Sequence, residues 1–283
     1  ETGEEFFKRR MALEAAAADA DPSTVQGGGA LLDLARFYVG HEMDLEALGI
    51  LKFAVTERPE IEQDPYFLGM RGAANAMSHR LAEAEADLSR GALRGDPSAA
   101  LWRALVASER SEWERAGELF RDAGDHIFSY PPAKAAEFAI AWSEAALNTN
   151  DFDVARRQAE QAVLNGDRET KERGQIVLAT LTSIIDGPAA AYPEFERLSR
   201  EALEPNAVRA ELKRLELGVA AGRMTANDAA GELESLRFRW RGDGVEMATV
   251  GILSDQYMRV GRFREALLLA QSTALRDASA PGS

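Results

Sequence analysis

The segment WERAGELFRDA, residues Trp113–Ala123, contains the pattern that decides the fold of this chain. An aromatic residue is followed by two polar residues, then by Ala116, and then by apolar residues four and seven places after that Ala. The spacing returns at Phe152 with Ala155, at Phe263 with Ala266, and at Asp44 with Ala47. Apolar residues at this spacing share one face of a helix. Their recurrence predicts repeated units that bury their apolar faces against one another.

The clearest complete unit is a helical hairpin near the start of the chain. Its positions are Leu31, Leu34, Ala35 and Tyr38 on a first helix, then Ala47, Leu51 and Ala54 on a second, with Pro59 at its end. This order resembles the tetratricopeptide repeat family, whose units of about 34 residues are helix pairs. The resemblance implies a right-handed superhelix of antiparallel pairs, with a concave face formed by the first helices.

Looser copies follow along the chain. They are marked by Leu68, Gly72, Ala84, Leu88 and Pro97; by Ala104, Ala107 and Ala116; and by Trp142, Ala146 and Ala155. The seventh copy is again a good one, with Leu253, Tyr257, Gly261, Phe263, Ala266 and Ala270. The first of the looser copies departs from the family at Arg71 and Asn75. A fifth pair (168–203) has only Ala191 and Phe195 after a Gly187-Pro188 break, and a sixth (207–240) is divided near Gly222. Successive second-helix alanines lie 32 to 39 residues apart, apart from a 75-residue step before Ala266, which is about two units.

We therefore predict an all-α chain: a right-handed α-solenoid of about seven antiparallel helix pairs plus an N-terminal helix. It would form a single domain over residues 1–283. Within it we expect the N-terminal helix at 1–22, better-formed repeats at 23–165, degenerate repeats at 166–243, and the last repeat and tail at 244–283.

The amino-acid composition argues against several classes of function. The formal charge of −14, from 33 basic and 47 acidic residues, argues against nucleic-acid binding. The absence of Cys excludes disulfides, thiolate metal sites and cysteine catalysis. The sequence contains no run of about 18 apolar residues, so it predicts no membrane span. Because the chain starts Glu-Thr-Gly rather than with Met, we expect one region of a larger bacterial protein. The missing Cys and start Met favour the cell envelope (periplasm), with the cytoplasm as the alternative.

Catalytic signals are weak. The three histidines, His41, His79 and His126, each fall near a predicted helix end, and no two have the spacing of a metal site. Gly27-Gly28-Gly29 lacks the further Gly or Lys of a nucleotide-binding loop, and we interpret it as a linker or the start of a helix. We predict no enzyme activity, no cofactor and no metal.

The predicted concave face suggests two functions. Its residues would be Arg36, Tyr66, Leu101, Leu105, Glu109, Ile140, Glu144, Asn148, Arg214, Asp255 and Arg259. A protein or peptide partner is the first hypothesis, although the Lys, Asn and Arg clamp that some relatives use for a peptide carboxylate is missing. The alternative is a small ligand, such as a glycan or lipid, held by Leu101, Leu105 and Ile140 beside Tyr66. A merely solvated inner face stays open for each residue.

Two further features concern the end of the chain. Arg237, Arg239 and Arg241 alternate with Phe238 and Trp240, which predicts either an anion or partner patch or a filled gap between the sixth and seventh pairs. The chain also ends soon after the apolar run 267–270, without a further capping helix. This favours self-association through the C-terminal edge, or a protein that continues past residue 283.

Overall fold

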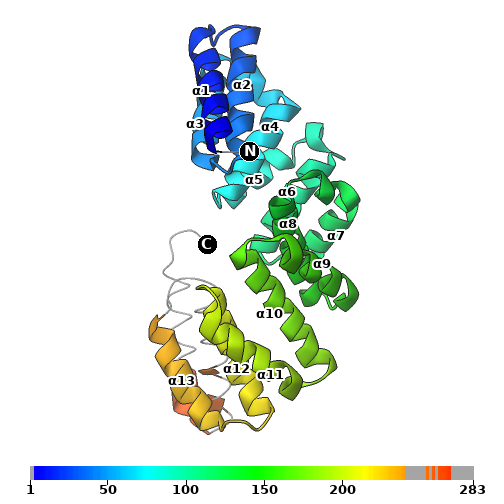
Figure 1. Ribbon diagram of the computed structural model, residues 1–283, viewed down its shortest axis with the longest axis vertical. Coiled ribbons are helices and arrows are strands. Elements are labelled where there is room, and N and C mark those ends of the chain that lie inside the picture. The colour runs from blue at the N-terminus through cyan, green and yellow to red at the C-terminus, as the bar shows by residue number, and fades with distance from the viewer. Residues whose placement is uncertain (1–2, 240–252, 255–256, 259–260, 269–283) are drawn as a thin grey trace. The chain divides into compact units, whose positions relative to one another are not determined.

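The computed structural model describes residues 3–239, 253–254, 257–258 and 261–268. Helices are the only regular elements in this part of the chain (Figure 1). The α-helices are α1 (Gly3–Asp19), α2 (Val25–Gly40), α3 (Asp44–Glu57), α4 (Pro65–Met77), α5 (Leu81–Leu88), α6 (Pro97–Glu109), α7 (Trp113–Ala123), α8 (Pro132–Asn148), α9 (Phe152–Asn165), α10 (Arg168–Ile185), α11 (Pro188–Glu201), α12 (Asn206–Ala220) and α13 (Ala226–Arg239). Three 3-10 helices connect some of them: η1 (Pro59–Gln63), η2 (Gly91–Leu93) and η3 (Gly124–Ser129).

Helices that follow one another along the chain pack together. The pairs α2 with α3, α4 with α5, α6 with α7, α10 with α11 and α12 with α13 are all in contact, and α2 also contacts α4, which contacts α6. The all-α class and the consecutive helix pairs are therefore confirmed. The contacts divide the chain into two compact units, residues 1–131 with 144–150 and residues 132–143 with 151–283, which we describe separately. The single domain and the handedness of the superhelix stay predictions.

The recurring alanine marks the point where each second helix touches its partner. These alanines are almost completely buried: Ala47, Ala84, Ala116 and Ala155 at 0% exposure, Ala191 at 1% and Ala266 at 4%. The residue four places later is buried as well in each described copy that continues, for example Leu51, Phe120 and Phe195. The spacing seen in the sequence is thus the contact face of the second helices.

In the first five of these pairs a small residue lies on the first helix twelve positions before the alanine. The residues are Ala35, Gly72, Ala104, Ser143 and Ala179, and each is buried. In the fourth pair the Ser143 Oγ donates to the backbone oxygen of Ala155 over 2.7 Å, so the two helices touch at the marker itself. In the second pair a Cβ on Gly72 would lie 2.5 Å from Cγ of Leu88, which is itself buried. Small residues therefore let the two helix backbones approach each other closely.

Gly72→Ala tests this close approach. Leu88 has no room to move, so we expect the variant to lose about 1–3 kcal/mol of unfolding free energy. Gly69→Ala on the same helix is the matched control, because its Cβ would meet nothing within 4 Å. That substitution should be neutral or stabilising by up to about 1 kcal/mol. Denaturant unfolding measures both; equal effects of the two substitutions would contradict the argument.

The turn between the two helices of a pair has one repeated backbone shape. A residue with positive φ lies five places before the alanine in five turns: Glu42 (58°), His79 (55°), Ser111 (59°), Asn150 (61°) and Gly261 (78°). In four of them the amide that follows bonds back to the first helix, as in Met43 N to Tyr38 O at 2.9 Å and Glu112 N to Ala107 O at 2.9 Å. This is the Schellman motif, which satisfies the last carbonyl groups of a helix. Glycine is therefore favoured here on backbone grounds, yet most of these turns use another residue.

Ser111→Gly should stabilise the protein. The left-handed conformation costs a residue with a Cβ about 1 kcal/mol or more, whereas Gly adopts it freely. We expect a gain of about 1 kcal/mol in unfolding free energy, measured by denaturant titration. Ser199→Gly, within α11, should instead lose about 0.5 kcal/mol. A Ser111→Gly variant no more stable than the original protein would refute this account of the turn.

The sixth pair is better formed than its sequence suggested. Its marker is Ala229, which is buried at 0%, with Leu233 and Leu236 buried four and seven places later. The 75-residue step before Ala266 therefore divides into two ordinary steps. The sequence pattern did not identify this marker for two reasons. No aromatic residue lies three places before it, and the positive-φ Gly222 lies seven places before it rather than five.

The departure from the family at Arg71 has a partner that compensates for it. The guanidinium of Arg71 donates two hydrogen bonds of 2.7 Å to the carboxylate of Asp87, which is 4% exposed. It also donates to Glu62 over 3.1 Å and lies 4.9 Å from the ring centre of Phe67. These contacts with Asp87 raise the pKa of Arg71 above its usual value. An ion pair with one buried partner thus occupies this helix crossing.

The three consecutive glycines belong to the first turns of α2. A Cβ on Gly27 would lie 1.9 Å from the backbone oxygen of Asp21, and one on Gly28 would lie 2.7 Å from an Arg58 nitrogen. A Cβ on Gly29 would meet nothing. The first two glycines therefore make room for the preceding loop and for Arg58. Their interpretation as the start of a helix is confirmed.

Candidate functional site

Three neighbouring first helices of the first unit carry most of the predicted partner-binding residues that are accessible. On α2, α4 and α6 the residue directly after the buried small position is Arg36, Ala73 and Leu105 respectively. Tyr66 and Glu109 lie on the same helices, one near the start of α4 and one at the end of α6. We call these five residues the first-helix face. Arg36, Tyr66 and Glu109 are exposed, Leu105 is half-buried, and Ala73 is covered.

Arg36 and Tyr66 are brought together from different helices. Tyr66 is 45% exposed, and the Arg36 guanidinium lies close enough to its hydroxyl to act on the ionisation of that group. Partial burial raises the pKa of Tyr66 above its usual value, Arg36 acts in the opposite direction, and the nearby Asp33 carboxylate adds to the rise. The sequence named Arg36 and Tyr66 independently, and the structure places them in one contact.

Glu109 is held at the other end of the face. Its Oε2 lies 2.8 Å from Nδ1 of His79, which belongs to the turn after α4. The imidazole is 79% exposed, so this contact is open to water. This side-chain contact therefore links the turn between α4 and α5 to the C-terminal end of α6.

Two predicted face residues are in the core instead. Leu101 and Ile140 are both 0% exposed, so they present no surface to a partner or ligand. The correction has a structural cause for Leu101: α4, α5, α7 and η3 all pack on α6 and enclose most of its circumference. The register of a repeat predicts which way a side chain points, but it does not reveal how many neighbouring elements pack on its helix.

The remaining predicted residues are occupied or outside the described chain. Arg214 donates 2.8 Å hydrogen bonds to both oxygens of Glu211 and bonds to Glu232 and Tyr192, and these contacts raise its pKa. Asn148 is exposed and donates to the backbone oxygen of Glu144, which is half-buried. The side chains of Arg237 and Arg239, residues Trp240, Arg241, Asp255 and Arg259, and the C-terminal edge after Leu268 lie outside the described residues.

One contact missed by the sequence pairs a possible nucleophile with a base. Ser98 Oγ lies 2.7 Å from His126 Nε2, and Ser129 Oγ lies 3.4 Å from the same nitrogen. Nucleophilic catalysis also needs a group that orients the base and donors for an oxyanion. Among the described residues no carboxylate bonds to His126, so the contact fastens η3 to α6. Nor do the described residues group three acidic or histidine side chains as metal ligands would be grouped.

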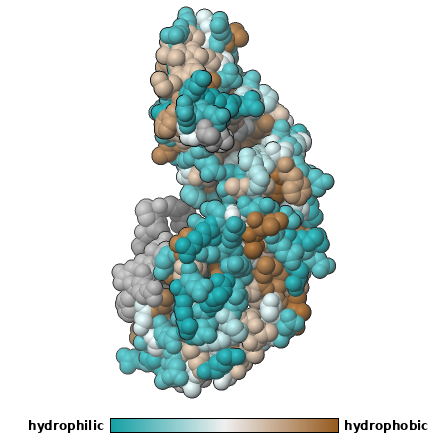
Figure 2. All heavy atoms as spheres, viewed as in Figure 1, coloured by the Kyte–Doolittle hydropathy of each residue, from teal (hydrophilic) through white to brown (hydrophobic). Residues whose placement is uncertain are grey.

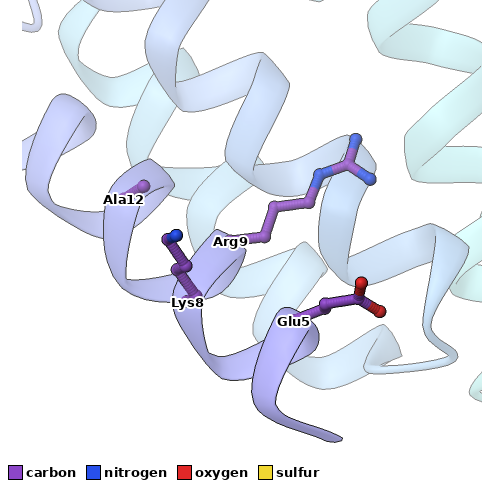
Figure 3. A pocket seen from close by; sticks show the side chains of 4 residues that line it. All are labelled: Glu5, Lys8, Arg9 and Ala12. Atoms are coloured by element: carbon purple, nitrogen blue, oxygen red, sulfur yellow. The ribbon is translucent and has the colours of Figure 1, made fainter. Parts of the chain in front are cut away.

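The surface depressions are shallow. One is lined only by Glu5, Lys8, Arg9 and Ala12, all on α1, whose side chains project from a single helix (Figure 3). Two others, of about 300 Å³ each, lie in the second unit beside α11. Hydrophilic residues cover most of the face drawn in Figure 2, with hydrophobic patches between them. In the part of the chain that is described, no helix is long and apolar enough to cross a membrane.

The described residues form a tetratricopeptide-like helical repeat. Among solved structures, a tetratricopeptide repeat protein from Parabacteroides merdae is 14% identical, with a TM-score of 0.47, over 88% of this chain and 93% of that one. Yeast Tom70 is 15% identical, with a TM-score of 0.46, over 96% of this chain and 62% of that one. No protein-family model and no curated protein sequence matches the chain. The fold assignment therefore rests on the helix pairs and their buried positions.

Arg36→Ala tests the contact on which the face depends. Because the Arg36 charge lowers the pKa of Tyr66, removing it should move ionisation of the Tyr66 phenol to higher pH. An ultraviolet titration of phenolate absorbance measures the change, with Tyr66→Phe identifying the contribution of this tyrosine. Arg121→Ala, on the exposed side of α7, serves as the control and should leave the titration unchanged. An unchanged Tyr66 titration in Arg36→Ala would mean that the two groups do not interact.

Proposed function

We propose that this chain is a non-catalytic scaffold whose first-helix face binds a protein or peptide partner. The observation that carries the proposal is the set of accessible side chains Arg36, Tyr66, Leu105 and Glu109 on three helices that pack side by side. Most other positions of α4 and α6 are buried in the core. A binding surface of this kind needs only residues that project from a rigid support, which the helix pairs provide.

The structure does not contain the exposed apolar patch that suggested the small-ligand alternative. Its apolar patch required Leu101 and Ile140 at the surface, and both are buried. The two depressions beside α11, of about 300 Å³ each, are at the lower limit of the volumes typical of small-molecule sites. An extended partner that lies across several helices suits the available surface better. We further propose, from the absence of Cys, that the chain works as part of a bacterial envelope protein.

A capture experiment with matched charge variants tests the proposed function. The double variant Arg36→Glu with Glu109→Lys reverses both charges of the first-helix face. Arg121→Glu with Glu118→Lys makes the same changes on exposed positions of α7. Immobilised protein is incubated with extract from the source organism, and the captured proteins are compared. We expect the face variant to lose a partner that the α7 variant retains; identical capture by both variants would contradict the proposed function.

A further inference from the structure

The two ends of the first-helix face carry opposite charge. At the α2 end, Arg36 is exposed and lies near the Tyr66 hydroxyl, and the exposed Asp33 carboxylate on the same helix also lies near that hydroxyl. Among the described residues no carboxylate lies within salt-bridge distance of Arg36, whereas Arg71 and Arg115 in the same unit each have one. Its guanidinium therefore has donors left for an acidic group from outside, and bidentate pairing with a carboxylate is the geometry that Arg favours.

The α6 end of the face is acidic. Glu109 is exposed at the last turn of its helix, and its contact with His79 uses only the Oε2 atom. The other oxygen, Oε1, accepts no hydrogen bond from a described residue. A Lys or Arg side chain from a partner fits this end, because a cation is attracted to the carboxylate and to the helix C-terminus together.

The middle of the face lacks long side chains. On α4, which lies between the other two helices, a Cβ on Gly69 would meet nothing within 4 Å, and Ala73 is buried. On α2, Gly29 is equally open, at the position that Tyr66 occupies on α4. A peptide backbone can approach a helix closely where glycine leaves such space. Leu105 then offers an apolar contact next to the acidic end.

Building on the proposed function, we propose that the occupant of the face is an extended peptide segment with one acidic and one basic residue on either side of an apolar one. The acidic residue pairs with Arg36, the apolar residue lies over Gly69 and against Leu105, and the basic residue pairs with Glu109. Packed helices lie about 8–10 Å apart, so α2 and α6 are about 16–20 Å apart. An extended chain covers that distance in about five or six residues.

A random dodecapeptide library displayed on phage tests this proposal, with the full chain and its single variants as targets. The full chain should select peptides with an acidic and a basic residue about five or six positions apart. Arg36→Glu should shift the selection to peptides with two basic residues, and Glu109→Arg to peptides with two acidic ones. For one selected peptide made synthetically, Arg36→Glu should weaken binding about tenfold or more. Arg121→Glu should leave the affinity within about twofold.

Gly69→Leu separates the possible failures. This substitution fills the open space over α4 without touching either charge, and it favours the helix, so the variant should fold and lose the selected peptides. Two outcomes would overturn the charge assignment and leave the proposed function standing. In the first, the selected peptides depend on Gly69 but lack the pair of opposite charges. In the second, both charge variants select the same peptides as the original chain. Selection of no peptide that depends on the first-helix face would overturn both.

Discussion

The close crossing of two helices at a small residue is the contact on which the first five pairs depend. A buried alanine on the second helix meets a buried Ala, Gly or Ser on the first, and large apolar residues such as Leu51 and Phe120 pack beside it. Closely packed interiors respond to the addition of a single methyl group, so this position determines how near the two helices lie. Once that distance is set, the first helix of each pair holds its outward side chains at a fixed place beside those of the next pair. The first-helix face follows from this repetition.

Much of the fold could be predicted from the sequence because the crossing has a fixed spacing. Apolar residues four and seven places after an alanine identify a second helix wherever they occur, and this placed the hairpins around Ala47, Ala116 and Ala155. The same approach missed Ala229, since the pattern had been tied to a preceding aromatic residue that the contact does not need. It also did not predict the ion pair between Arg71 and Asp87. Register could have suggested that pair, because both residues point into the same helix crossing.

The candidate site was predicted less completely. Helical register placed Arg36 and Tyr66 on one face, which the structure shows in contact. It placed Leu101 there too, although the packing of α6 buries that side chain completely. Burial depends on every element that packs on a helix, and the packing of η3 on α6 does not follow from the repeat pattern. The direction in which a side chain points thus follows from local helical register and can be predicted from the sequence. The exposure of that side chain to solvent depends on how the whole unit packs.

The turns within the pairs have a different implication. Their shape is imposed by backbone hydrogen bonds, and the left-handed position accepts Glu42, His79, Ser111 and Asn150 in turn. An acid, an imidazole, a hydroxyl and an amide thus occupy equivalent points along one edge of the repeat. Side-chain chemistry at this edge can change from one descendant to the next while the helix pairs stay as they are. The edge is therefore a place where such a protein can acquire new contacts in evolution, as the reach of His79 to Glu109 already illustrates.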